Sequence, residues 1–86
     1  MTSLGVGPRL GYMKTSDITL ATTISLWILP EKIERIKNSN KVFFVYPENK
    51  KIDDIVEKYW RRELRVEPRS FFDQLRALKG QIYATE

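Results

Sequence analysis

The side chains best suited to chemistry are gathered in one stretch of the chain, from Lys58 to Gly80. Guanidinium and ammonium groups bind phosphate oxygens, and an exposed aromatic ring beside them can stack on a base. The cationic candidates are Arg61, Arg62, Arg65, Arg69, Arg76 and Lys79. The aromatic candidates, for a base or for a protein partner, are Trp60 and Phe72 in this stretch and Tyr83 three residues after it. The stretch therefore predicts a surface that binds an acidic partner, with DNA or RNA as the first candidate.

A purely structural interpretation of the same residues stays open. Lys58, Arg61 and Arg62 follow an amphipathic helical pattern, and cations at a helix C-terminus complement the helix dipole. Trp60 lies one position off the apolar stripe of that pattern, which favours packing at the edge of the core over stacking on a base. Acidic residues are interleaved with the cations and would neutralise part of their charge: Glu57, Glu63 and Glu67.

Catalysis and metal binding are disfavoured by what the chain lacks. The sequence contains no His and no Cys, so it offers no imidazole base, no thiolate nucleophile and no ordinary zinc ligand set. Ser16 has no His to activate its hydroxyl, and Thr15-Ser16-Asp17 is better explained as a helix cap. Asp53 and Asp54 are adjacent, so they diverge by about 100° on a helix. We expect a non-catalytic protein without a cofactor, a metal or a small-molecule substrate.

Length and composition bound the class of protein. The 86 residues suffice for one domain, and a hydrophobic content of 42% is typical of a globular core. The 15 Lys and Arg exceed the 11 Asp and Glu, which gives a net charge of +4 and favours polyanions. No apolar run approaches the length of a membrane span, and no signal-peptide pattern opens the chain. These features predict a soluble, cytoplasmic protein.

The N-terminal part divides into an arm and a helix. Residues 1–12 contain three Gly and one Pro, which predicts a flexible arm ahead of a single domain over residues 13–86. Arg9 and Lys14 could place the arm in a nucleic-acid groove, although plain disorder is the commoner state of such arms. A helix follows, capped by Thr15 or Ser16 and ended by Pro30. Its apolar stripe is Ile18, Ala21, Ile24 and Ile28, and Leu20 and Trp27 broaden this stripe.

The middle of the chain predicts a β-hairpin. Residues 42–46, "VFFVY", are apolar on both faces, and the Asn38-Ser39-Asn40 cluster before them is a turn. Residues 31–37 would form the first strand, although their apolar positions also fit a helix. Their many charges favour an exposed edge strand. Because a strand that is apolar on both faces needs cover on both sides, the hairpin suggests self-association or docking to a partner.

Two further helices are expected after the hairpin. Asn49 caps the first of them, whose stripe is Ile52, Ile55, Val56 and Tyr59. Residues 63–68, "ELRVEP", form a short extended piece that could add a third strand. Pro68 then starts the last helix. Its core stripe is Phe71, Leu75, Leu78 and Ile82, and a basic–aromatic row of Phe72, Arg76, Lys79 and Tyr83 runs beside it.

The predicted fold is therefore α+β. The expected order is helix, β-hairpin, helix, short extended segment and helix, with the helices packed on a small antiparallel sheet.

The order of short motifs resembles a known family. The motifs "YMKTSDITLATTISLWI", "KVFFVY", "IVEKYW" and "LRVEPRSFFDQLRALKGQIY" resemble short prokaryotic and phage proteins known only as a domain of unknown function. The resemblance covers Met13 to Tyr83. Residues 1–12 extend beyond the usual start of the family, Pro30 replaces an expected Gly, and Arg61-Arg62 replaces a frequent turn-forming Asn-Gly. The resemblance implies a shared fold and brings no activity with it.

Two functional hypotheses follow from these patterns. The first is a small nucleic-acid-binding or nucleoprotein-associated module that uses its basic surface. The alternative is a protein-interaction or assembly subunit, either a homo-oligomer or an accessory protein. Such a subunit would bind through an exposed strand edge or through the Phe72 and Tyr83 row.

Overall fold

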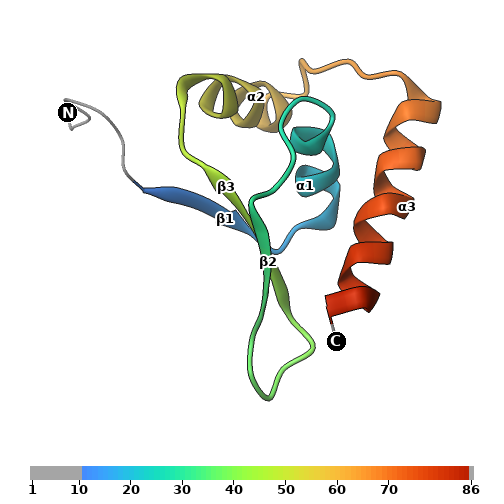
Figure 1. Ribbon diagram of the computed structural model, residues 1–86. Helices are drawn as coiled ribbons and strands as arrows, with labels where there is room; N and C mark the ends of the chain where they lie inside the picture. The colour runs from blue at the N-terminus through green and yellow to red at the C-terminus, as the bar shows by residue number, and fades with distance from the viewer. Residues whose placement is uncertain (1–10, 86) are drawn as a thin grey trace.

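The fold is a three-stranded antiparallel sheet with helices on one of its faces, as the computed structural model shows for residues 11–85 (Figure 1). The elements are β1 (Tyr12–Thr15), α1 (Ile18–Ser25), β2 (Lys32–Arg35), β3 (Val42–Pro47), α2 (Lys50–Trp60) and α3 (Pro68–Thr85). The strand order is β1-β3-β2. The predicted α+β class is confirmed. The predicted arm lies mostly outside the described residues, but Tyr12 belongs to β1.

The third strand of the sheet comes from the N-terminal end of the domain. The sequence suggested that residues 63–68 could supply it, but residues 63–67 form an unpaired connection between α2 and α3. Instead β1 pairs antiparallel with β3, with Met13 opposite Tyr46 and Thr15 opposite Phe44. A central strand offers hydrogen-bonding groups on both sides, and β1 uses the side that β2 leaves open.

The hairpin forms largely as predicted. β2 is an edge strand of four residues, shorter than the expected span of 31–37, and it pairs with β3 so that Ile33 lies opposite Phe44. The turn follows at the Asn38-Ser39-Asn40 cluster, and Asn38 has a φ of 65°. Asn is among the few residues that adopt this left-handed conformation at low cost, which explains its use in the turn.

The two faces of β3 are covered in different ways. Phe44 and Tyr46 face the helices and belong to the core. Val45 points to the opposite face, yet only 1% of its surface is exposed. It lies opposite Lys14 of β1 and Lys32 of β2, whose aliphatic stems can shield it. The burial of Val45 is therefore complete without a second molecule.

A carboxylate ties the two outer strands together across this face. Glu34 accepts from Lys14 Nζ at 3.0 Å and pairs with Lys32 Nζ at 3.1 Å. The hydrogen bond from Lys14, followed by that from Lys32, lowers the pKa of Glu34. The two lysines are thereby held above β3.

Helix α1 begins later and ends earlier than the sequence suggested. Asp17, not Thr15 or Ser16, is the cap, and its Oδ1 accepts from the backbone N–H groups of Thr19 and Leu20 at 2.9 and 3.2 Å. The helix ends at Ser25, well before Pro30. The residues that α1 buries end at Ser25 as well, and the chain beyond must turn back to enter β2.

The core lies between the sheet and the helices. Its buried members are Leu20, Ala21, Ile24, Phe44, Tyr46, Ile52, Ile55 and Leu78. The hydroxyl of Tyr46 donates to the carbonyl oxygen of Ala21 at 2.8 Å and shares a hydrogen bond of 2.8 Å with Ser25 Oγ. Burial raises the pKa of Tyr46 above its ordinary 10.0. This residue joins the sheet to α1 through both packing and hydrogen bonds.

Helices α2 and α3 keep their predicted inner faces. Asn49 caps α2, as expected, and its Oδ1 accepts from the N–H of Ile52 at 2.9 Å. Of the predicted stripe of α3, Leu78 is fully buried and Ile82 packs against the core, while Phe71 and Leu75 are half-buried. α3 runs alongside α1 and ends near β2, where Arg35 Nη2 donates to the carbonyl oxygen of Ile82 at 3.1 Å (Figure 1).

Candidate nucleic-acid interface

The predicted site residues form two neighbouring groups on the surface. The α2–α3 corner consists of Trp60, Arg61, Arg62 and Arg65, at the end of α2 and in the connection after it. The α3 stripe consists of Arg69, Phe72, Arg76, Lys79 and Tyr83. All nine side chains are exposed to solvent. Within residues 11–85, no hydrogen bond or ion pair joins the corner to the stripe, so each group is held by its own element.

The corner is built on a Schellman motif. Arg61 is the C-cap of α2, the N–H of Arg62 donates to the carbonyl oxygen of Tyr59 at 3.1 Å, and that of Glu63 donates to Lys58 O at 3.0 Å. The motif requires a left-handed residue after the C-cap, and Arg62 has a φ of 62°. The turn that the resemblance expects at Asn-Gly thus keeps its left-handed position here, with an arginine in it.

The charges of the corner are only partly neutralised. Arg61 Nη2 pairs with Glu57 Oε2 at 2.8 Å, and both side chains are exposed, so the structural interpretation holds for this residue. Arg65 Nη1 donates to the backbone oxygens of Arg62 and Leu64 at 3.2 and 3.3 Å, and no carboxylate among residues 11–85 pairs with it. The side chain of Arg62 has no ion-pair partner among the described residues.

The position of Trp60 in the sequence favoured packing at the edge of the core, but the structure exposes its side chain. It is 64% exposed, because α2 ends here and its buried stripe stops at Tyr59. The two rings meet edge to face, with centroids 5.0 Å apart and planes at 86°. Together with Arg62 they line a shallow hollow of about 390 Å³. An exposed indole beside an unpaired guanidinium can receive a base and its phosphate.

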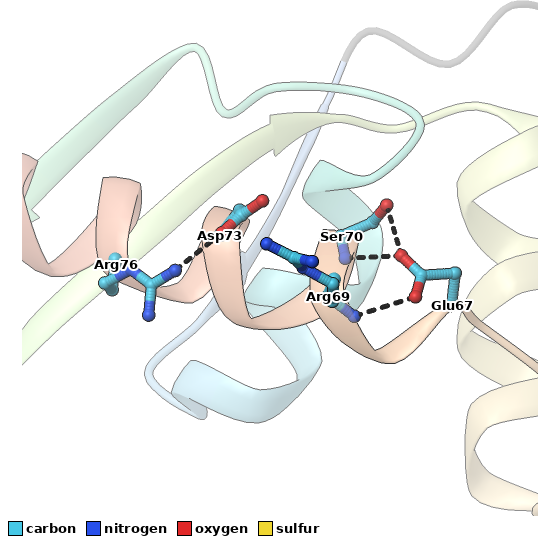
Figure 2. A network of polar contacts seen from close by, with 5 residues as sticks. All are labelled: Glu67, Arg69, Ser70, Asp73 and Arg76. Atoms are coloured by element: carbon cyan, nitrogen blue, oxygen red, sulfur yellow. Dashed lines mark hydrogen bonds and ion pairs between the residues drawn. The ribbon is translucent and has the colours of Figure 1, made fainter.

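A carboxylate outside the helix sets the start of α3. Glu67 accepts from the backbone N–H of Arg69 at 3.0 Å and from the N–H and Oγ of Ser70 at 2.8 and 2.9 Å (Figure 2). The bond from Arg69 N–H, followed by those from Ser70, lowers the pKa of Glu67. Glu67 thus acts on backbone groups at the helix start, and Figure 2 marks no contact between it and the guanidinium of Arg69. The acid expected to neutralise the cluster caps the helix instead.

The α3 stripe is a continuous line of exposed side chains. Its members recur at alternating intervals of three and four residues, so they share one face of the helix over about 21 Å. Phe72 is 56% and Tyr83 70% exposed. Arg76 Nη2 pairs with Asp73 Oδ1 at 2.6 Å (Figure 2). Arg69 and Lys79 have no ion-pair partner in the described part of the chain.

A second concave surface was missed by reasoning from the sequence. A groove of about 420 Å³ lies between the end of α1 and α2, and Trp27 and Lys58 are among its lining residues. The helical pattern placed Trp27 in the core stripe of α1, but the helix ends before it and leaves it 43% exposed. The only signal in the sequence was the series of lysines on the polar side of α2.

Two further features are absent from the described residues. Residues 11–85 contain no cluster of three or more Asp or Glu side chains placed to hold a metal ion. None of the described helices has the length and apolar character needed to cross a membrane.

Comparison with known proteins places the chain in a family. The family model described as "Domain of unknown function (DUF5659)" matches residues 11–84, and the chain therefore belongs to this family. The resemblance to a domain of unknown function predicted from the motifs is confirmed. No curated protein and no solved structure matches the chain.

Proposed function

We propose that this member of a family of unknown function is a small non-catalytic nucleic-acid-binding protein. The α2–α3 corner and the α3 stripe form its binding surface. Arg62, Arg69 and Lys79 contact phosphates, while aromatic rings of both groups stack on unpaired bases. The excess of basic residues adds a long-range attraction for the polyanion.

The observation that carries this proposal is the exposure of large aromatic rings among cations. Trp60, Phe72 and Tyr83 are each more than half exposed, and every one of them has an exposed Arg or Lys within four positions in the chain. Exposed aromatic surface of this size is costly in water and marks interaction sites when it is grouped. With cations between the rings, a single-stranded nucleic acid matches the surface in both charge and shape.

The conformation of Arg62 supports the same conclusion. A non-glycine residue in the left-handed region is strained by about 1–2 kcal/mol, and glycine would fill the Schellman position without that strain. Strained residues cluster at functional sites, where the side chain is needed in spite of its cost. The side chain of Arg62 is exposed and unpaired within the described residues, as a phosphate contact requires.

A mobility-shift titration tests the proposal. Wild-type protein is titrated against single- and double-stranded DNA and RNA at about 50 and 200 mM salt, and single strands should bind more tightly, with affinity falling steeply as salt rises. Arg69→Ala/Lys79→Ala should weaken binding on the order of tenfold and make it less sensitive to salt. The control Lys37→Ala/Lys41→Ala removes the same charge from the hairpin, where neither lysine belongs to the corner or the stripe, and should have a smaller effect.

Two results would overturn the proposal. One is the absence of binding to every nucleic acid at the lower salt concentration. The other is an equal loss in the two double variants, because that result would reduce the interaction to net charge without a defined surface.

A second candidate function is supported by the spacing of the α3 stripe. Intervals of three and four residues are those of a helix–helix seam, and Phe72 and Tyr83 could anchor a partner helix. The cations of the stripe would repel a like-charged copy, so an accessory role beside an acidic protein fits better than a symmetric dimer. Sedimentation velocity measures whether the chain forms a homo-oligomer. A protein that stays monomeric at every concentration would exclude the homo-oligomer.

A further inference from the structure

The groove between α1 and α2 carries an inference of its own. Its apolar lining consists of Trp27, which follows α1, Leu64, which follows α2, and Ile55 of α2. The remaining lining residues are on α2: Lys50, Lys51, Asp54 and Lys58. A volume of about 420 Å³ is in the range of small-molecule sites.

The groove carries an uncompensated positive charge. Its lining contains three lysines and one carboxylate. None of the three lysines has an ion-pair partner among the described residues. Lys51 and Lys58 are seven residues apart, which is two helical turns, so they lie on the same side of α2 with Asp54 between them. Ammonium groups gathered in this way attract an anion, and a phosphate can accept hydrogen bonds from more than one of them.

The groove also offers a surface for a planar ring. The indole of Trp27 is 43% exposed, and an exposed indole face can stack on the planar ring of a base. Asp54 can only accept hydrogen bonds when it is ionised, which suits the exocyclic amino group of adenine, guanine or cytosine.

We propose that the α1–α2 groove binds one nucleotide, with the base stacked on Trp27 and the phosphate held by Lys51 and Lys58. The combination of a ring, an acceptor and ammonium groups distinguishes a nucleotide from a simple anion and from an uncharged aromatic molecule. This inference rests on the proposed nucleic-acid binding and adds that the groove binds a single nucleotide. The nucleotide is either free or part of a bound strand.

The position of the groove favours a strand that continues to the α2–α3 corner. Leu64 lines the groove and also a neighbouring hollow of about 270 Å³, which Tyr59 and Arg62 border as well. Tyr59 and Arg62 in turn line the hollow beside Trp60. The concave surfaces therefore follow one another from Trp27 to Trp60.

Fluorescence titration with a mononucleotide tests the inference. The chain has two tryptophans, so in a Trp60→Phe variant Trp27 is the only tryptophan that reports. AMP should quench its emission in a saturable way, and adenosine and inorganic phosphate should each bind at least about tenfold more weakly, because each lacks half of the contacts. Adding Lys51→Ala/Lys58→Ala should weaken AMP binding on the order of tenfold, whereas Lys37→Ala/Lys41→Ala should leave it unchanged.

The possible results separate this inference from the proposed function. If AMP does not quench Trp27, if phosphate alone binds as tightly as AMP, or if the Lys51 and Lys58 variant binds AMP normally, the nucleotide site is overturned. The binding surface at the corner and the stripe would still stand if Arg69→Ala/Lys79→Ala weakens binding of the polymer. If an oligonucleotide displaces AMP, the site holds a nucleotide of a strand. If AMP binds and no oligonucleotide competes, it holds a free nucleotide.

Discussion

At the end of α2, a cationic side chain occupies a backbone position that glycine would fill at lower energy. Arg62 has a φ of 62°, and its N–H and that of Glu63 close the helix on Tyr59 and Lys58. These hydrogen bonds involve only backbone groups, so glycine at this position could make them as well. Arginine is strained at this φ, whereas glycine is not. Under the proposed function, Arg62 is therefore the residue at which nucleic-acid binding and the stability of the fold oppose each other.

Replacing Arg62 by glycine should therefore stabilise the fold. We expect Arg62→Gly to raise the free energy of unfolding by about 0.5–1 kcal/mol, since the relief of strain exceeds the added flexibility of the unfolded chain. The matched control is Arg61→Gly, which removes the same charge at a φ of −82° where glycine brings no relief. It should be destabilising. Urea denaturation measures both, and a stabilised Arg61→Gly or a destabilised Arg62→Gly would contradict the account.

At the scale of the element, α3 depends on a carboxylate that precedes it. Glu67 satisfies two backbone N–H groups of the first turn, which have no partner within the helix. Pro68 fits the first position because it has no N–H to satisfy. These two residues set where the helix begins.

The cap gives α3 a defined dependence on pH. Because the pKa of Glu67 is lowered in the folded state, its contribution is fully present above the ordinary pKa of 4.5 and is lost as the pH falls through the lowered value. Glu67→Gln should reduce helicity and thermal stability at neutral pH, and the difference from wild type should shrink at acid pH. Circular dichroism follows both quantities.

The control for this prediction is a neighbouring glutamate. Glu63→Gln removes the same charge from the connection, where the side chain has no hydrogen bond in the described structure. It should leave the helix content unchanged at every pH. An equal loss of helicity in the two variants would show that charge, not capping, matters at this end of α3.

At the scale of the whole molecule, one side chain joins the layers. Tyr46 belongs to the central strand, is fully buried, and binds Ala21 and Ser25 of α1 through its hydroxyl. The ring fills the core between the sheet and the helices, while the hydroxyl satisfies polar groups that water cannot reach. The small core of this domain makes such a link a large fraction of its stability.

Tyr46→Phe isolates the hydroxyl from the ring. We expect a loss of about 1–2 kcal/mol, because Ser25 Oγ is left buried without this partner. For a domain of this size, such a loss lowers the Tm by roughly 4–8 °C per kcal/mol. The matched control Tyr12→Phe removes a hydroxyl from an exposed ring of β1 and should not change the Tm. A thermal melt that does not distinguish the two variants would rule out the hydrogen bonds as a stabilising link.

Alkaline pH should lower the stability of the fold through the same tyrosine. The pKa of Tyr46 is raised by burial, so above pH 10.0 the unfolded chain loses this proton while the folded chain retains it. Stability then falls as the pH rises, because the unfolded state binds fewer protons than the folded state.

Much of the local structure could be derived from the sequence, because local structure depends on neighbours in the chain. The period of the apolar residues in α2 and α3, the cap at Asn49, the turn around Asn38 and the start at Pro68 were all predicted correctly. The alignment of Phe72, Arg76, Lys79 and Tyr83 along one face of α3 also followed, since residues three and four apart share a helix face.

Only the tertiary structure decided which distant segments meet. Four residues, "YMKT", are too few to show the alternation of a strand, and β1 forms because β3 has an open side. Val45 is covered by lysines of strands that lie far from it in the chain. The end of α1 at Ser25 exposes Trp27 beside the lysines of α2. Periodicity describes one element at a time, whereas a groove or a sheet exists only between elements whose pairing is set by long-range burial.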